Sequence, residues 1–436
     1  MAEAMSDQPN GASTAPVDAP LTTYTPRYID IGINLADPIF RGRYHGKSRH
    51  PDDLKAVVGR AVEVGCTKLI VTGSSFKSSR DALKLAKEFP GTVFATAGIH
   101  PCSSSIFSTS HHKHHDESQS EGEGEGADEA EHTPACDPDP SQPIPDGEGV
   151  DHARSEKIIA DLADLIAQAR KESSSSSSSS SHPPGGDLVA FGEFGLDYDR
   201  LHYCSKEVQL HSFSAQLRLA SSLSPPLPLF LHSRAAHADF VRLLQEAFGA
   251  RLERLERGGV VHSFTGTVAE MRELMDLGLY IGVNGCSFKT AENCAVVKEI
   301  ELSRLMLETD GPWCEVRPSH EGWKYLVEFE AKVKANAAAA AAASSPAQGE
   351  VGTSGKQQQQ QQQGKKKNQK KEPEVPERFK TVKKEKWEEG AMVKGRNEPC
   401  TIERIAKIVA GIKGVSVEEV CEAAWANTVK VFGLDS

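Results

Sequence analysis

The chain has 436 residues, of which 38% are hydrophobic and 25% are charged, and its formal net charge is −11. Thirteen acidic residues and no Lys or Arg lie between Asp116 and Asp151. The rest of the chain holds 50 basic and 48 acidic residues and is therefore nearly neutral. This charge does not exclude nucleic acid as a partner. Nine scattered cysteines without a CxxC pair, and the lack of any apolar run near the ~20 residues of a bilayer span, exclude a disulfide-stapled protein and a membrane protein. The first 26 residues resemble no secretory or transit signal. We therefore expect an intracellular protein of the nucleus, the cytoplasm or both, which is not secreted.

Short, nearly continuous apolar runs recur along the chain and predict strands that are buried on both faces, as in a parallel sheet. They cover residues 28–34, 68–72, 93–100, 188–193, 227–232, 259–262, 279–284 and 304–310. Segments with helical apolar spacing alternate with them, at residues 52–64, 79–88, 155–169, 207–219, 238–248 and 268–277. This alternation predicts an α/β fold, a (β/α)8 TIM barrel, with a doubly wound open sheet as the alternative. A final helix, capped by Asn397 with Pro399 in its first turn, is expected to close the fold.

Low-complexity segments interrupt this pattern and cannot build a core. We predict a disordered extension over residues 1–26 and a single domain over residues 27–436, with disordered inserts at about 103–151, 172–186 and 335–376. The last insert holds the alanine run Ala337–Ala343 and the basic run Lys365–Lys371. For the basic run, a solvated tail and a nuclear-localisation or nucleic-acid contact both remain open.

Metal-capable side chains end four of the predicted strands, namely Glu193, His232, His262 and Asp310. The strand ends of a parallel barrel converge on one mouth, so these side chains would become neighbours there. Two imidazoles and two carboxylates suit Zn²⁺ or Mn²⁺, and Mg²⁺ when waters complete its shell. Taken singly, each has an ordinary explanation as a hydrogen-bonded histidine or a turn residue, and the grouping depends on the barrel.

Further polar residues follow other predicted strands. His100 can contact phosphate or assist protonation, or it can simply pack beside Pro101. Asp197 can orient a ligand as a hydrogen-bond acceptor or cap a turn. Arg234 is a candidate phosphate contact, because a guanidinium grips phosphate oxygens in a bidentate manner.

The ordered segments IDIGINL, GIHP, GEFGLDYDR, LFLHSR, VVHSFTG, YIGVNG, ETDGPW and RNEPC resemble the TatD family of metal-dependent deoxyribonucleases, in particular its eukaryotic branch. The resemblance implies a TIM barrel of the metallo-dependent hydrolase superfamily, with Glu193, His232, His262 and Asp310 as metal ligands and Glu193 bridging two ions. Many superfamily members carry an HxH pair where this chain has Gly32-Ile33-Asn34. A weaker second site would favour exchangeable Mg²⁺, with Mn²⁺ or Zn²⁺ as alternatives.

The activity expected from this resemblance is hydrolysis of DNA phosphodiester bonds in the 3′ to 5′ direction by metal-activated water. Asp310 would bind metal and act as general base, and His100 would contact the phosphate or the leaving oxygen. Asn34, Arg200 and Arg234 are the expected substrate contacts. DNA is the expected partner, and nothing in the sequence points to a protein partner or a membrane. The alternatives are a hydrolase of a small amide, lactone or phosphoester, and a non-catalytic binding or scaffold protein.

Overall fold

A computed structural model describes residues 24–109, 149–176, 186–344 and 375–434 of the chain. Nearly all of the predicted N-terminal extension, most of the three inserts and the basic run Lys365–Lys371 lie outside these described residues. The single-domain arrangement with its inserts therefore stays a prediction.

The predicted strands form one parallel sheet in which every strand pairs with the next one along the chain. They are β1 (Tyr28–Ile33), β4 (Cys66–Val71), β5 (Val93–Ala97), β6 (Leu188–Asp197), β7 (Leu229–Arg234), β8 (Gly259–Val261), β9 (Tyr280–Val283) and β10 (Leu305–Leu307). The sheet closes on itself, because the amide of Asp310 donates to the carbonyl of Gly32 and the amide of Asn34 to that of Gly311, each at 2.8 Å. The (β/α)8 TIM barrel is confirmed, and the open sheet was the wrong alternative.

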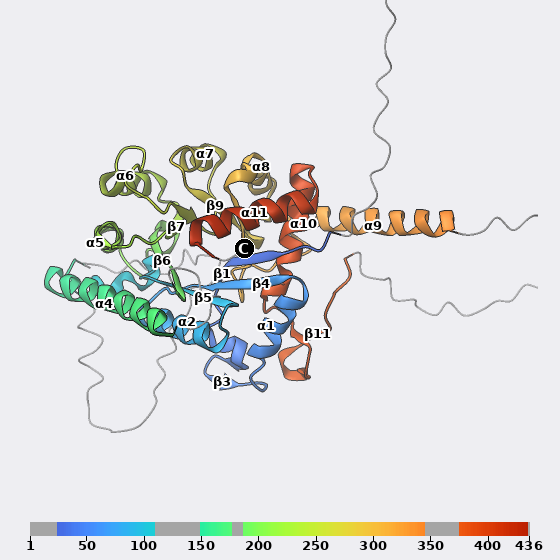
Figure 1. Cartoon of the computed structure of the whole chain (residues 1–436), viewed down its shortest axis with the longest axis horizontal. Coiled ribbons are helices and arrows are strands. Elements are labelled where there is room, and N and C mark those ends of the chain that lie inside the picture. Colours follow the sequence, from blue (N-terminus) through green and yellow to red (C-terminus); the bar gives the residue numbers. More distant parts are fainter. Residues whose placement is uncertain (1–23, 110–148, 177–185, 345–374, 435–436) are drawn as a thin grey trace, which may run out of the picture.

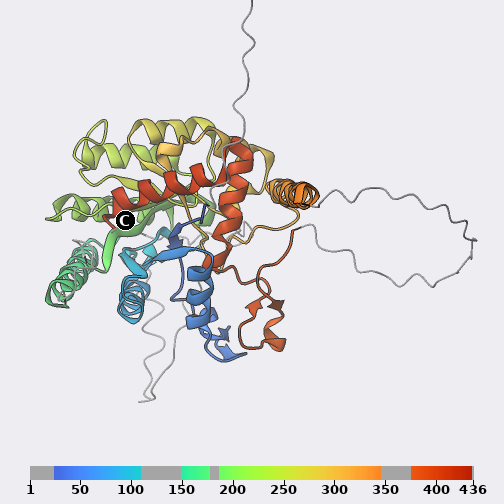
Figure 2. The same cartoon turned by 45° about the vertical axis from the view of Figure 1, so that its right-hand side comes forward.

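Helices cover the outside and one end of the barrel, and one long helix, α9, extends away from it (Figures 1 and 2). They are α1 (Leu54–Glu63), α2 (Phe76–Glu88), α4 (His152–Ser176), α5 (Lys206–Ser222), α6 (His237–Phe248), α7 (Val268–Asp276), α8 (Ala291–Glu299), α9 (Trp323–Ser344), α10 (Ile402–Lys413) and α11 (Val417–Phe432). Short strands pair in the loops, β2 (Arg43–Tyr44) with β3 (Lys47–Ser48) and β11 (Thr381–Val382) with β12 (Met392–Val393). Within the described residues, no helix combines the length and apolar character needed to cross a bilayer.

Helix α11 closes the barrel at the end where the strands begin. Its Trp425 and Phe432 pack in one apolar cluster with inward residues of the strands, such as Ile31 and Phe230. The side-chain amide of Asn427 donates to the carbonyls of Leu302 and Leu305, next to the start of β10. The opposite end of the barrel, where the strands finish, is therefore the end left for a functional site.

Two predictions about local structure were wrong. The alanine run Ala337–Ala343, expected to be disordered, continues helix α9, because alanine has the highest helix propensity of all residues. Asn397 does not cap the helix that follows it, since a 3-10 turn at Pro399–Thr401 precedes α10. Instead its amide donates to the carbonyls of Thr309 and Trp313, at 2.9 and 2.7 Å. Asn397 thereby fixes the chain that follows β10.

Candidate metal centre and active site

Glu193 lies within β6, whereas the sequence had predicted that it ends this strand. The pairing of β6 with β7 matches Gly192 to Phe230 and Phe194 to Leu231, so Glu193 is the extra residue of a β-bulge. A bulge re-aims the side chain that it carries. The bulge also requires glycine before it, because Gly192 has φ 140° and a Cβ there would lie 2.1 Å from the carbonyl oxygen of Phe230.

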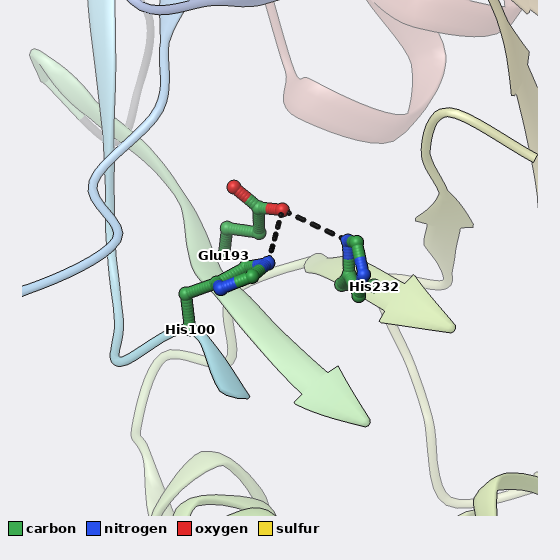
Figure 3. Close-up of side chains that lie close together, drawn as sticks. All are labelled: His100, Glu193 and His232. Atoms are coloured by element: carbon green, nitrogen blue, oxygen red, sulfur yellow. Dashed lines mark hydrogen bonds and ion pairs between the residues drawn. The ribbon is translucent and has the colours of Figure 1, made fainter. Parts of the chain in front are cut away.

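Three imidazoles converge on one oxygen of Glu193. Its Oε1 lies 3.3 Å from Nε2 of His100, 3.1 Å from Nδ1 of His232 and 2.6 Å from Nε2 of His262. All four side chains are buried. Figure 3 shows the rings of His100, in the loop after β5, and His232, in β7, pointing at the carboxylate. Oxygen and imidazole nitrogen atoms gathered at these distances are the donor set that a divalent cation takes.

The residues predicted for the site all line one pocket at the carboxyl ends of the strands. The cavity has a volume of about 80 Å³. Its lining comprises Asn34, Ser74, His100, Ser103, Glu193, Arg200, His232, Arg234, His262, Ser263, Asp310, Trp313 and Cys314. The structure thus brings together every residue that the sequence singled out as catalytic, metal-binding or substrate-binding. Their individual chemical roles remain predictions.

Among the described residues, the group whose ligand atoms lie close enough to hold one ion together is His100, Glu193 and His232. His100 had been predicted to be catalytic and not a ligand. Its Nδ1 accepts a hydrogen bond of 3.1 Å from the amide of Cys102, which leaves Nε2 facing Glu193. Burial lowers the pKa of His100 to about 3, so the ring is neutral, as a metal ligand must be.

Burial and neighbouring charges shift the pKa values of the ionisable groups in the site. Burial would raise the pKa of Glu193, but the facing His262 and His100 hold it well below its usual range, so the group is a carboxylate. Burial would likewise lower the pKa of His262, but Glu193 and Glu308 raise it well above normal. Burial raises the pKa of Asp310 to about 7. Carboxylates crowded in this way favour a cation among them.

Asp197 both orients a histidine and caps a turn, the two interpretations that its position had left open. Its Oδ2 lies 3.2 Å from Nε2 of His232, and its Oδ1 accepts a hydrogen bond from the amide of Asp199. Arg200 is buried and donates to the same Oδ2 at 2.5 Å. A carboxylate on the far nitrogen of a histidine fixes the ring's orientation and tautomer. Arg200, predicted to contact substrate, is thus bound to this positioning group.

Asn34 holds Asp310 in place. Its side-chain amide donates to Oδ1 of Asp310 at 3.0 Å, while its own oxygen accepts from the hydroxyl of Thr72 at 2.6 Å. The other oxygen of Asp310 accepts from the thiol of Cys314 at 3.3 Å. Asn34, also predicted to contact substrate, therefore uses its amide to orient a predicted metal ligand.

Glu308 is a site residue that the sequence reasoning missed. It is fully buried, and its Oε1 accepts from the amide of Ser263 and from Asn284 at 2.5 and 3.3 Å. Its Oε2 has no hydrogen-bond partner and lies 3.5 Å from Nδ1 of His262. Gly32 leaves room for it, because a Cβ there would approach Oε2 to 2.5 Å. The signal was available, since the strand predicted over residues 304–310 holds this second acid two residues before Asp310.

Comparison with known proteins identifies the family to which this chain belongs. The family model described as TatD related DNase matches residues 29–137 and 184–433. The chain belongs to this TatD-related family. The family assignment predicted from the sequence motifs is therefore confirmed, and with it the prediction of an enzyme of the hydrolase class that acts on ester bonds. The alternative of a non-catalytic scaffold gains no support.

Individual relatives cover most of the chain. A protein named deoxyribonuclease Tat-D from Schizosaccharomyces pombe is 36% identical over 405 residues, which is 93% of this chain and 95% of the relative. The protein of that name from Saccharomyces cerevisiae is 34% identical over 460 residues, 97% and 93% of the two chains. A crystal structure titled as an uncharacterized amidohydrolase from Saccharomyces cerevisiae aligns with a TM-score of 0.67 and 31% identity, over 93% and 99% of the chains. A TatD family hydrolase from Entamoeba histolytica, at 24% identity and a TM-score of 0.61 over 94% and 99%, shows the shared fold.

Proposed function

We propose that the chain is a divalent-metal-dependent deoxyribonuclease that removes nucleotides from the 3′ end of DNA. The observation that carries the proposal is the convergence of His100, His232 and His262 on Oε1 of Glu193 in a pocket shared with Asp310 and Arg234. The two yeast relatives are named deoxyribonucleases. A relative from Edwardsiella piscicida, 31% identical over 65% of this chain and 79% of its own length, is named a 3′-5′ ssDNA/RNA exonuclease.

The residues of the site fit a metal ion. We assign His100, Glu193 and His232 to one cation, and His262 and Asp310, together with Glu193, to a second. When bound, divalent cations lower the pKa of water towards neutrality and offset the charge of a phosphodiester. Glu193 and Asp310 both line the pocket, and a cation bound between them would offset the repulsion between their carboxylates and the substrate's phosphate.

The protein's own groups then position the reaction. Arg234, at the end of β7, lines the pocket and is the guanidinium that we assign to the phosphate oxygens. Asp310, whose two oxygens are held by Asn34 and Cys314, is placed to accept the proton of the attacking water. Asp197 holds the ring of His232, and Glu308 faces the ring of His262. These contacts keep the imidazoles aimed at Glu193.

The size of the cavity favours a polymer end over an enclosed small molecule. Pockets that bury a small ligand usually measure about 300 to 1,000 Å³. At about 80 Å³, this cavity lies well below that range, and we infer that it takes the phosphate group while the attached nucleoside lies outside the mouth. This observation weighs against the alternative of a small amide or lactone substrate.

The test uses the full-length protein and single-stranded DNA labelled at either the 3′ or the 5′ end. After chelation, Mg²⁺, Mn²⁺ or Zn²⁺ is added back separately, and Glu193→Gln is measured beside Glu256→Gln, a control at an exposed acid. We expect metal-restored early loss of the 3′ label in the wild type and the control but not in Glu193→Gln. Equal rates in Glu193→Gln would overturn the metal assignment, and internal fragments with an intact 3′ label would overturn the exonuclease direction.

A further inference from the structure

Two cysteines of the barrel mouth lie in contact. Cys286 is in the 3-10 turn after β9 (Gly285–Phe288), and Cys314 follows β10. Both cysteines are reduced, and their Sγ atoms are 2.8 Å apart. The two backbones also meet, because a Cβ on Gly285 would lie 1.8 Å from the carbonyl oxygen of Cys314. Glycine at position 285 is thus what permits this approach of the two segments.

Only one of the two thiols reaches the functional pocket. Cys314 lines it, whereas Cys286 is absent from its lining and is 2% exposed. The sulfur of Cys314 donates to Oδ2 of Asp310 at 3.3 Å. The segment between these residues is conformationally demanding, because Asp310 and Cys314 both adopt left-handed backbone angles, φ 53° and 55°, which non-glycine residues rarely take.

We propose that Cys286 and Cys314 form a peroxide-responsive dithiol whose oxidation to a disulfide lowers the activity of the adjacent site. The effect on activity rests on the proposed nuclease function, whereas formation of the disulfide does not. The disulfide would remove the S–H donor from Oδ2 of Asp310 and draw the backbone of Cys314 towards Cys286. Asp310 would keep Asn34 as a partner but lose the group that orients its second oxygen.

The oxidation is balanced with hydrogen peroxide as the two-electron oxidant. The sulfur of Cys314, reached through the pocket, attacks one peroxide oxygen; the O–O bond breaks, and Cys314 becomes a sulfenic acid as one water leaves. The sulfur of Cys286 then attacks the sulfenic sulfur, the S–S bond forms, the S–O bond breaks and a second water leaves. The two thiols lose two protons and two electrons in all, and the peroxide takes up both and becomes two waters. The sulfur atoms need to approach by less than about 1 Å to reach disulfide bonding distance.

The site has features that favour this pair over an isolated thiol. A sulfenic acid persists or oxidises further unless a resolving thiol stands beside it, and Cys286 is already in contact. Peroxide is small enough to enter a cavity of about 80 Å³. Cys294, buried in α8, offers a matched control because it is a free thiol outside the pocket.

The experiment treats full-length protein with hydrogen peroxide and then divides the sample. One half is alkylated and digested without reduction, and mass spectrometry searches for a peptide pair linked through Cys286 and Cys314. The other half is assayed on labelled single-stranded DNA before and after a dithiol reductant. The same measurements are made on Cys286→Ala, on Cys286→Ser as a more conservative variant, and on Cys294→Ala.

We expect the linked peptides in wild type and Cys294→Ala. Both should also lose activity by about tenfold or more, which is typical of a lost supporting contact to a metal ligand. The reductant should reverse this loss. Both Cys286 variants should keep their starting activity and lack the linked peptides and the reversible loss. Absence of linked peptides in the wild type would overturn the proposal, as would an equal reversible loss in the Cys286 variants. If the protein proved inactive on DNA, the linked peptides would still decide whether the dithiol oxidises, so the two proposals fail separately.

Discussion

Nδ1 of His262 lies 3.5 Å from Oε2 of Glu308, while Nε2 of the same ring lies 2.6 Å from Oε1 of Glu193. One imidazole is therefore held between a carboxylate in the pocket and a carboxylate buried beneath it. This is the arrangement in which a buried acid fixes the orientation of a metal-binding histidine and increases its basicity.

Replacing Glu308 with Gln should weaken metal binding without unfolding the protein. The amide keeps the acceptor for Ser263 but removes the charge that faces His262. We expect metal affinity to fall roughly 10- to 100-fold, the usual cost of losing such a supporting group. Calorimetric titration with Mn²⁺ measures this directly, beside Glu256→Gln as the exposed control. A wild-type affinity in Glu308→Gln would show that the buried acid does not support the site.

Replacing Asn34 with Ala should have a similar effect through Asp310. The variant removes the donor to Oδ1 of Asp310 and leaves the hydroxyl of Thr72 without its acceptor. We expect kcat/KM on DNA to fall by roughly 10- to 100-fold. The comparison with Thr72→Val separates the two contacts, since that change leaves the bond from Asn34 to Asp310 intact and should cost less. If Asn34 instead bound substrate, KM would rise and metal affinity would not change.

Asp30 should make stability depend on pH. This fully buried carboxyl accepts hydrogen bonds from the amides of Gly32 and Thr309, and burial raises its pKa to about 8. Between about pH 4, near the usual pKa of an Asp in an unfolded chain, and pH 8, the folded state binds a proton that the unfolded state does not. Asp30 therefore stabilises the fold at low pH, and this contribution falls by about 1.4 kcal/mol per pH unit across that window.

Asp30→Asn tests this sign, because the amide mimics the protonated acid. The free energy of unfolding of the variant, relative to wild type, should rise steadily as the pH increases through the window and level off above about pH 8. Urea denaturation at several pH values measures the difference, with Asp276→Asn on the surface as the control. A difference that does not vary with pH would contradict the raised pKa.

Much of the fold and of the candidate site could be predicted from the sequence, for a physical reason. Strands buried on both faces stand out as apolar runs, and the polar residues that end them converge because parallel strands finish at one end of a barrel. Glu193, His232, His262 and Asp310 were found in this way. The disorder predicted for the alanine run of α9 was wrong because low complexity does not prevent a helix when the repeated residue is alanine, which has the highest helix propensity.

Other features depend on contacts that no local pattern encodes. Glu308 directly follows the apolar strand β10, and its position facing His262 depends on a contact between two strand ends that the sequence pattern does not encode. The contact of Cys286 with Cys314 depends on the path of two loops, and the spacing of the two cysteines matches no known motif. The roles expected for Asn34 and Arg200 ignored neighbours that already use their polar atoms.

Metal binding should stabilise the fold measurably. A ligand that binds only the folded state adds about 2.7 kcal/mol at a concentration of 100 times its Kd. We expect Mg²⁺ or Mn²⁺ to raise the melting temperature of chelated protein, and Glu193→Gln to lose this increase because the negative charge that three imidazoles face is gone. Glu256→Gln should respond as the wild type does. An undiminished increase in Glu193→Gln would place the cations elsewhere.

The C-terminal segment should be held to the barrel by a buried ion-pair network. Arg396 donates to both oxygens of Asp53, at 2.9 and 2.6 Å, and to Glu398, whose other oxygen accepts from Arg60 in α1 at 2.8 Å. Arg396→Met would leave Asp53 without its main buried partner, at a cost of roughly 3 to 5 kcal/mol in the free energy of unfolding. Arg41 provides the control, because it binds two acids but its side chain is 42% exposed. Arg41→Met should cost no more than about 1 kcal/mol. Urea denaturation measures the free energy of unfolding of both variants. Equal losses in the two variants would mean that the buried network does no more than an exposed ion pair to anchor the segment that positions Asn397 beside Thr309 and Trp313.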